Sequence, residues 1–439
     1  DPGESWTPST TAGGSPGTAD LQADLALGSV VVNELLAHSD GGVEDWIELH
    51  NTTGVDIDIS GWFLSDDPGS LEKFVIPGNP SDPFAVGNTI LTAGGYIAFN
   101  QVDDFGGAFA LSELGDDVVI SSCDLTGALS TYRSFVGFDA TANGVTLGRH
   151  VLGTGEIDFV AMDAPTYETI NSDPLVGPIV IEEIMYNPDG PGGTEYVLMR
   201  NISGAAVTLY DPLNPASTWR LSSGAVDFVF PQGVTVGPND FVLITSVDSA
   251  TYLATHTVGA NVQVFGPLAG SLSNGGDTIT LTRPGKPETV PVAFTPYITV
   301  ETIKYNDSYP WPEAADGDGP ALSKLPGSLD QYGNDPANWG VSGAPVVTVD
   351  PLTTDDATPQ LTGTVTDVHQ PATVTVTVDG TDYIVPVVGD TWTLADDAIA
   401  PALVGGAYDV VVSAIDLVGN LGVDSTIDEL EIDAAVGVV

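Results

Sequence analysis

Residues 30–51, VVVNELLAHSDGGVEDWIELHN, decide the fold of this chain. Two short runs rich in β-branched and aromatic residues flank a polar Ser-Asp-Gly-Gly break, a pattern typical of two strands joined by a turn. Residues 179–201, IVIEEIMYNPDGPGGTEYVLMRN, place the same parts in the same order roughly 150 residues later. A repeated motif indicates a repeated module, so the chain is expected to hold two copies of one β-unit.

The second copy follows the first beyond this hairpin. Residues 74–77, FVIP, correspond to residues 228–231, FVFP, and further short apolar runs recur in the same order. Nearly every run is bounded by Gly, Pro, Asn or Asp, which favours strands over helices. Several runs are apolar on both faces, as expected where one sheet packs against another. The sequence therefore predicts an all-β chain built of tandem β-sandwiches.

Composition indicates the size and the setting of the chain. Its 439 residues correspond to three domains of ordinary size. With 60 acidic and 9 basic residues the formal net charge is −51, which excludes nucleic-acid binding because too few cations are present to neutralise phosphates. No segment has the long uncharged apolar run of a membrane span. A single cysteine, Cys123, excludes an intramolecular disulfide framework. This composition favours the exterior or cell surface of a bacterium or archaeon.

The repeated motif resembles the lamin tail domain, an Ig-like β-sandwich common in secreted bacterial proteins. The first copy matches the family pattern almost in full, at Asn33, Glu34, Trp46, Ile47, Glu48, Leu49, Asn51, Ser60, Gly61, Trp62, Leu64, Ser65 and Asp66. The second copy departs from it, with Glu182 in place of Asn and Val-Leu-Met at residues 197–199 in place of Ile-Glu-Leu. The resemblance covers residues 27–342. It implies an accessory module beside hydrolases, kinase-like proteins or adhesins, and so indicates location more than reaction.

From residue 344 the pattern changes. Residues 373–380, TVTVTVDG, alternate with a period of two and run into an Asp-Gly turn, which predicts a β-hairpin. Further along, residues 406–420 resemble the last strands of bacterial Ig-like repeats found in surface adhesins. We therefore expect five regions: a tail at residues 1–26, lamin-tail-like domains at 27–172 and 173–343, a bacterial Ig-like domain at 344–433, and an apolar tail at 434–439.

The sequence contains no recognisable catalytic arrangement. There is no G-x-S-x-G nucleophile elbow and no H-E-x-x-H motif. The five histidines are isolated from one another, at His38, His50, His150, His256 and His369. Adjacent carboxylates are frequent, as expected at this acid content. We therefore predict that the chain is not an enzyme. Three glycosylation sequons, at Asn51, Asn201 and Asn306, leave glycosylation open because such matches occur by chance.

Calcium is the candidate cofactor, since it prefers carboxylate and carbonyl oxygens on loops. Asp316-Gly-Asp318-Gly alternates acids as such loops do, but it lacks the later ligands of an EF-hand, so an ordinary acidic turn is an equal alternative. Asp355, Asp356, Asp416 and Asn420 are a second candidate set, expected to meet at a domain junction where Ca²⁺ would stiffen a tandem array. A solvated acidic surface is the more ordinary interpretation of the same charge. The two can coexist.

The leading functional hypothesis is an extracellular structural or adhesive protein that self-associates into a cell-surface filament or array. The tails are its candidate assembly elements, with Trp6, Val436, Val438 and Val439 completing or covering β-surfaces of neighbouring copies. The alternative is an accessory region of a larger secreted enzyme that binds polysaccharide or the cell surface. In that reading the sugar-facing aromatic residues are Tyr309 and Trp311.

Overall fold

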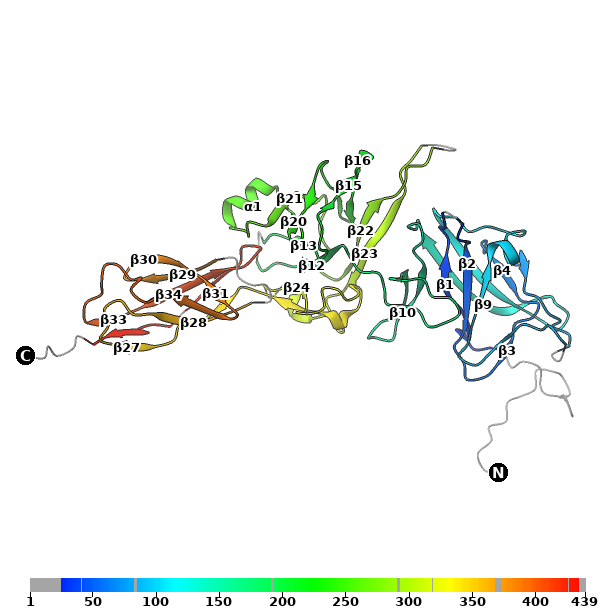
Figure 1. The fold of residues 1–439 in the computed structure, drawn as a ribbon, viewed down its shortest axis with the longest axis horizontal. Helices are drawn as coiled ribbons and strands as arrows, with labels where there is room; N and C mark the ends of the chain where they lie inside the picture. Colours follow the sequence, from blue (N-terminus) through cyan, green and yellow to red (C-terminus); the bar gives the residue numbers. More distant parts are fainter. Residues whose placement is uncertain are drawn as a thin grey trace, which may run out of the picture. The chain divides into compact units, whose positions relative to one another are not determined.

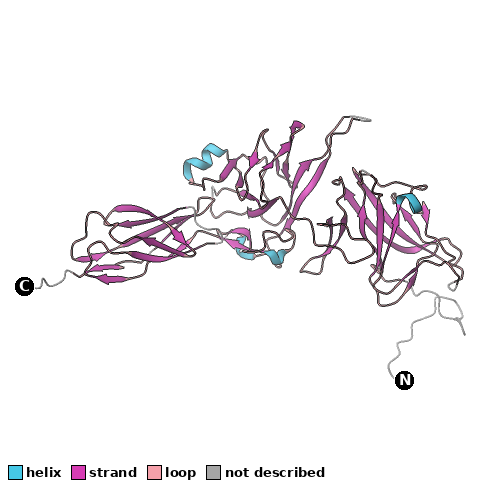
Figure 2. Cartoon of the chain, in the orientation of Figure 1, coloured by secondary structure: helices cyan, strands magenta, loops and turns pink. Residues whose placement is uncertain are grey.

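The computed structural model describes residues 25–40, 42–82, 85–190, 193–289, 293–317, 319–367, 373–424 and 426–433 (Figure 1). Regular structure in these residues is almost entirely β (Figure 2), which confirms the predicted fold class. The α-helix is α1 (Ser249–Thr255), and the short helical turns are Gln101–Phe105, Glu313–Ala315 and Pro336–Asn338. No helix among these residues is long and apolar enough to cross a membrane.

The described residues fall into two compact units. One reaches to Leu175 and includes Gly285–Thr299; the other begins with Val176–Pro284 and continues from Val300. The boundaries predicted from the sequence, at residues 172 and 343, stay a prediction.

The first unit contains a sandwich of two main sheets, which we call the first sandwich. Its larger sheet has the order β11-β10-β1-β2-β7, with β1 (Val30–Leu36), β2 (Trp46–Asn51), β7 (Tyr96–Asn100), β10 (Leu147–Val151) and β11 (Ile157–Ala161). The facing sheet has the order β5-β4-β8-β9, with β4 (Phe63–Ser65), β5 (Phe74–Val75), β8 (Gly115–Cys123) and β9 (Leu129–Asp139). A short pair, β3 (Ile57–Asp58) and β6 (Ile90–Leu91), lies beside them. The predicted hairpin is confirmed, because β1 and β2 pair antiparallel, with a bulge between Val32 and Glu34.

A sandwich of the same design, which we call the second sandwich, is built almost entirely from the second unit. Its larger sheet has the order β21-β20-β13-β12-β24-β25, with β12 (Ile179–Met185), β13 (Tyr196–Asn201), β20 (Phe241–Thr245), β21 (Val262–Phe265), β24 (Ala321–Lys324) and β25 (Trp339–Ser342). The facing sheet has the order β18-β17-β22-β23, with β17 (Arg220–Ser222), β18 (Asp227–Val229), β22 (Asp277–Pro284) and β23 (Tyr297–Tyr305). Two short pairs complete it: β14 (Val207–Thr208) with β19 (Thr235–Val236), and β15 (Tyr210–Asp211) with β16 (Asn214–Thr218). The bulge recurs between Ile181 and Glu183, so the repeat extends to backbone detail.

The second unit ends with a smaller sandwich, which we call the Ig-like domain. One four-stranded sheet has the order β26-β28-β32-β31, with β26 (Val346–Val347), β28 (Leu361–Thr366), β31 (Val387–Val388) and β32 (Thr391–Leu394). The other has the order β30-β29-β34-β35, with β29 (Thr373–Val378), β30 (Thr381–Val385), β34 (Val410–Ile415) and β35 (Leu421–Val423). A third sheet joins β27 (Leu352–Thr354), β36 (Leu430–Ile432) and β33 (Gly406–Tyr408). The predicted Asp-Gly hairpin is confirmed: β29 pairs with β30, and both Asp379 and Gly380 have positive φ, as a type I′ turn requires.

The asparagine that ends each repeated motif is a buried structural residue. Nδ2 of Asn51 donates to the carbonyl oxygens of Val55, Leu91 and Thr92 at 2.7–3.0 Å. Asn201 makes the same three bonds in the second sandwich. These bonds satisfy carbonyl groups that the ladders leave free. A glycan on either nitrogen would break them, so the first two sequons serve the fold.

Candidate functional site: the outward face of the larger sheets

Each larger sheet has one face in the sandwich core and one face outside it. Side chains alternate along a strand, so the core residues Ile47 and Leu49 of β2 place their neighbours on the other side. We call this other side the outward face. In the first sandwich it carries Glu34, Leu36, Trp46, Glu48 and His50, and in the second Glu183, Met185, Tyr196, Leu198 and Arg200. Glu34 lies opposite Glu48, and Glu183 lies opposite Leu198.

In the first sandwich the outward face is polar and is covered by residues 163–172. Glu34 accepts the backbone N–H of Thr166 at 3.1 Å and also its hydroxyl. Glu48 accepts the N–H of Glu168 and, at 2.8 Å, the side-chain amide of Asn33. Both carboxylates are fully buried. The family's two glutamates therefore bind backbone groups, and in doing so they hold the covering segment on the sheet.

Burial makes Glu48 a weak acid. Its pKa is raised from 4.5 to about 7, chiefly because burial disfavours the charged form. The negative charges of Glu34 and Glu168 raise this pKa further, whereas the hydrogen bonds from Asn33 and from the Glu168 N–H oppose the rise. The group therefore titrates near neutral pH.

In the second sandwich the same face is mostly apolar, with Glu183 and Arg200 as its charged residues. It forms a separate hydrophobic cluster of Met185, Tyr196, Leu198, Phe241, Leu243, Tyr252, Ala321 and Val418. Val418 belongs to the Ig-like domain, in the loop of residues 416–420 between β34 and β35. The hydroxyl of Tyr252, on α1, donates to the carbonyl of Val418 at 2.8 Å, and the N–H of Gly259 donates to the carbonyl of Leu417 at 3.1 Å. The outward face is thus a docking face for the next domain.

The docking loop is held in shape by its own aspartate. Oδ1 of Asp416 accepts the N–H groups of Val418, Gly419 and Asn420 at 2.7–2.9 Å, and Oδ2 accepts the side-chain amide of Asn420 at 2.7 Å. Gly419 has φ +97°, and a Cβ there would lie 2.9 Å from Cβ of His256. Only glycine therefore fits both the turn and the close approach to the second sandwich.

Burial also acts on the carboxyl of Asp416. Its pKa is raised because desolvation outweighs the hydrogen bonds that favour the charged form. The same hydrogen bonds occupy the oxygens that the sequence suggested as Ca²⁺ ligands.

The structure separates the second candidate set of calcium ligands. Asp416 and Asn420 lie together, immediately after β34. Asp356 instead caps a turn by accepting the N–H of Thr358. The carbonyl of its neighbour Ala357 accepts the N–H of Leu403, which precedes β34 in the chain. Asp355 and Asp356 therefore lie at the opposite end of β34, which at its 6 residues is about 20 Å long. The expected meeting of these four residues does not occur.

The other predicted calcium ligands and the predicted assembly residues lie elsewhere in the chain. Asp316 directly follows the turn Glu313–Ala315, and its Oδ1 accepts the side-chain amide of Asn187 at 2.6 Å. Among the described residues no three His, Cys, Asp or Glu side chains form a group that could hold a metal ion. Outside the described residues lie Asp318, Trp6, Val436, Val438 and Val439.

The two proposed sugar-facing aromatic residues differ in exposure. Tyr309 is 86% exposed, whereas Trp311 is only 6% exposed. The indole of Trp311 packs against that of Trp339 at a centroid distance of 5.9 Å, inside the core of the second sandwich. The expectation that Trp311 faces a sugar is therefore wrong. Although it lies in an irregular loop, its ring fills space in the core of the second sandwich.

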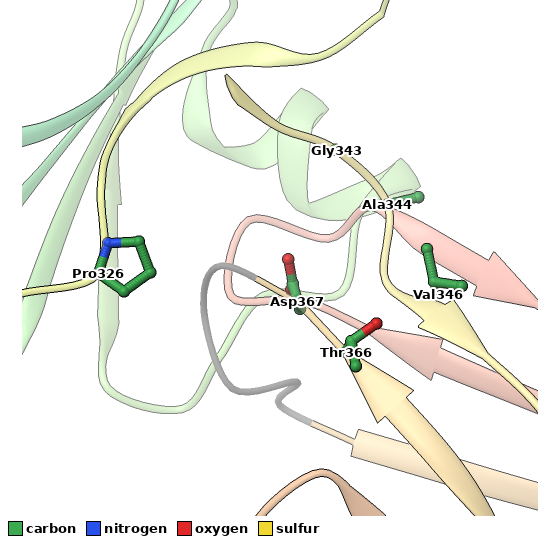
Figure 3. A pocket seen from close by; sticks show the side chains of 6 residues that line it. All are labelled: Pro326, Gly343, Ala344, Val346, Thr366 and Asp367. Carbon is green, nitrogen blue, oxygen red and sulfur yellow. The ribbon is translucent and has the colours of Figure 1, made fainter. Parts of the chain in front are cut away.

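A shallow pocket of about 340 Å³ lies where the second sandwich meets the Ig-like domain. Figure 3 shows its lining residues, Pro326, Gly343, Ala344, Val346, Thr366 and Asp367. Most of this lining is apolar or backbone, and no acid–base pair faces into it. The pocket is therefore a gap left where the two domains pack, and it lacks the groups of an active site.

The fold and the docking face define a class of protein, tandem Ig-like β-sandwiches whose larger sheets are covered from outside by other parts of the chain. The chain belongs to the lamin tail domain family, whose model, described as "Lamin Tail Domain", matches residues 24–131 and 173–296. This confirms the resemblance for both copies of the motif. None of the curated proteins compared with the chain matches it.

Two solved structures, one of a bacterial adhesin and one of a large adhesion protein, are similar at low identity. The first is described as "Structural insight into host cell surface retention of a 1.5-MDa bacterial ice-binding adhesin", with 12% identity, a TM-score of 0.19, and coverage of 89% of this chain and 91% of that one. The second is described as "Crystal structure of tetra-tandem repeat in extending region of large adhesion protein", with 15% identity, a TM-score of 0.21, and coverage of 92% and 99%.

Proposed function

We propose that this chain is an extracellular structural or adhesive protein, in which β-sandwiches are joined stiffly to hold position rather than to transform a substrate. The observation that carries this proposal is the docking of residues 416–420 on the outward face of the second sandwich. A connection that buries side chains of both domains resists bending, whereas a bare linker does not. Stiff junctions between modules are what an extended surface protein requires.

Comparison of the two sandwiches supports this role. The position that carries Glu48 in the first sandwich carries Leu198 in the second. Glu48 binds a backbone N–H of the covering segment, while Leu198 belongs to the cluster that receives Val418. The departure of the second copy from the family pattern therefore has a physical reason: an apolar face is needed to dock a neighbouring domain.

The energy of docking is adequate for a stable junction. Burial of an aliphatic side chain contributes about 1.5–3 kcal/mol, and Val418 is almost completely buried with Leu417 packed beside it. Because both domains belong to one chain, docking is intramolecular and costs less entropy than association of free partners. The bonds of Asp416 fix the loop beforehand and reduce that cost further.

The charge of the chain fits the proposed setting. A net charge of −51 favours solubility, and its self-repulsion is best tolerated where salt screens it. We place the protein outside the cell or on the cell surface, as the composition indicates.

Replacing Val418 by aspartate tests the docking. The new carboxylate would enter the apolar cluster close to Asp416 and Glu183, so we expect the Ig-like domain to be released from the second sandwich while both stay folded. Val418 lies outside the Ig-like core, which is why folding should survive. Limited proteolysis near residues 343–345 and small-angle scattering would show faster cleavage and a larger radius of gyration.

Val404→Asp is the matched control, because Val404 is 74% exposed in the same domain and should tolerate the charge. Identical proteolysis and scattering for V418D and the wild type would contradict the stiff-junction proposal.

Assembly of copies into a filament extends the proposal. If residues 1–20 complete or cover a β-surface of a neighbouring copy, their removal is expected to abolish polymers seen by electron microscopy and leave monomers. Removal of residues 434–439 tests the other tail in the same way. Polymers unaltered by both truncations would refute assembly through the tails.

A further inference from the structure

The third glycosylation sequon, which begins at Asn306, lies in a different environment from the first two. It directly follows β23, at the start of a loop. Asn51 and Asn201 are fully buried, whereas Asn306 is partly exposed and Ser308, which supplies the hydroxyl of the sequon, is exposed. The next residue, Tyr309, is 86% exposed. The third sequon is therefore the one that a large enzyme can reach on the folded chain.

The hydroxyl that such a sequon requires is held in the same way at all three positions. Oδ1 of Asn306 accepts the backbone N–H of Ser308 at 3.1 Å and also its hydroxyl. Thr53 makes the same two bonds to Asn51, and the second sequon repeats them. The amide oxygen is thus occupied by the sequon itself in each case, so any difference in reactivity rests with the amide nitrogen.

The amide nitrogens differ in what they bind. In each of the two buried sequons Nδ2 of the asparagine donates to three carbonyl oxygens at 2.7–3.0 Å. The bond from Nδ2 of Asn306 to the carbonyl of Gly275 is 3.5 Å long, beyond the usual range of about 2.7–3.2 Å for an N–H···O bond. A sugar on this nitrogen would therefore cost the fold little, whereas a sugar on either of the others would break buried bonds.

Two glycines leave space around the third nitrogen. A Cβ at Gly276 would lie 2.9 Å from Nδ2 of Asn306, closer than a side chain normally approaches. A Cβ at the preceding Gly275 would meet nothing within 4 Å, so this side of the loop is open. The nitrogen is consequently uncrowded as well as weakly bonded.

We propose that Asn306 is an N-glycosylation site, an inference that rests on the extracellular setting of the proposed function. Nδ2 of Asn306 attacks the anomeric carbon of an oligosaccharide linked through phosphate to a lipid carrier. The new bond joins this nitrogen to the anomeric carbon, and the bond from that carbon to the phosphate oxygen breaks. The electron pair leaves with the lipid phosphate, and the amide gives one proton to a base of the transferase.

A glycan at this position would protect the loop. Residues 308–310 are exposed, and exposed loop tips are preferred sites of proteolytic cleavage. A bulky, hydrophilic oligosaccharide attached at Asn306 would keep proteases away from these residues.

Transfer of a glycan to the folded full chain in vitro tests the proposal. The purified chain is incubated with a single-subunit oligosaccharyltransferase that accepts Asn-x-Ser/Thr sequons and with its lipid-linked oligosaccharide, and glycopeptides are identified by mass spectrometry. We expect one glycan per chain, at Asn306. Ser308→Ala should reduce transfer at least ten-fold, because it removes the hydroxyl of the sequon. Ser203→Ala, the matched change in the second sequon, should leave transfer unchanged.

Synthetic peptides separate the sequons from their folded surroundings. Without the fold all three asparagines should accept the glycan, in peptides of residues 45–57, 195–207 and 300–312. Selection of Asn306 would then be a property of the folded chain.

The proposal is overturned if the folded chain receives no glycan at Asn306, whether or not the peptides are modified. It is also overturned if Asn51 or Asn201 of the folded chain is modified as readily as Asn306, since burial would then not select the site. Neither result bears on the docking of residues 416–420, which V418D tests separately.

Discussion

Replacing Lys324 by alanine is expected to lower the free energy of unfolding of the second sandwich by about 3–5 kcal/mol. The side chain of Lys324 is fully buried, and its Nζ lies 3.0 Å from Oε1 of Glu301. The other oxygen of Glu301 accepts the N–H of Ile181 at 2.6 Å, so this carboxylate is fixed in the interior. Without the lysine a negative charge stays buried and unpaired, which is the costly outcome of breaking such a pair.

A double variant distinguishes a broken pair from a simple loss of packing. In Lys324→Met with Glu301→Gln the glutamine oxygen still accepts the N–H of Ile181, and the methionine fills the space of the lysine stem. We expect this variant to recover most of the loss, since an ion pair replaced as a whole by apolar or neutral groups is often neutral in stability. Urea unfolding followed by tryptophan fluorescence would report it, because Nζ of Lys324 lies 6.0 Å from the ring of Trp339.

Lys73→Ala is the control for these measurements. Lys73 pairs with Asp66 in the first unit, where both side chains are partly exposed, and exposed or partly exposed pairs contribute about 1 kcal/mol or less. An equal and small effect of K324A and K73A would show that the Lys324–Glu301 pair contributes little.

Raising the pH from about 5 to about 8 is expected to cost the first sandwich about 2–3 kcal/mol of stability through Glu48 alone. The pKa of Glu48 is raised from 4.5 to about 7 in the folded chain, chiefly by burial. The folded state therefore binds a proton at pH values where the unfolded chain has already released it. The stabilisation that the proton on Glu48 provides is complete below pH 4.5 and is lost as the pH rises through 7.

The substitution Glu48→Gln removes this proton and should flatten the dependence of stability on pH between 5 and 8. Absolute stability is not the criterion, because glutamine cannot accept both the Asn33 amide and the Glu168 N–H. Urea unfolding across the pH series, with hydrogen-exchange mass spectrometry reading peptides of β1 and β2, would measure the slope in the first sandwich. Glu156→Gln, at an exposed position, should retain the wild-type slope. An E48Q slope equal to that of the wild type would exclude Glu48 as its cause.

The repeated hairpin motif was enough to predict the fold class, the family and the pairing of β1 with β2. The reason is that strand alternation, turn residues and the closing asparagine are all local signals. The candidate site was much less accessible from the sequence. The sequence does show leucine at position 198, where the family pattern and Glu48 of the first copy have glutamate. This replacement is the one signal in the sequence that could have indicated a docking face.

The misplaced expectations have a common cause. The sequence-based expectation places Trp311 on an exposed loop facing a sugar, yet its ring packs on Trp339 in the core. Asp416 and Asn420 resemble metal ligands in sequence, but they hydrogen-bond to their own loop. In both cases the partner of the side chain, and not its type, decides its role.

The sequence by itself therefore determined that this protein is a string of acidic β-sandwiches with two lamin tail modules, because alternation and turn chemistry act within a few residues. Only the tertiary structure decided what covers each outward face. Those contacts join residues far apart in the chain, 132 positions for Glu34 and Thr166 and 166 for Tyr252 and Val418. Alternation shows which side chains share a face, but the segment that packs on that face is selected by the folded chain as a whole.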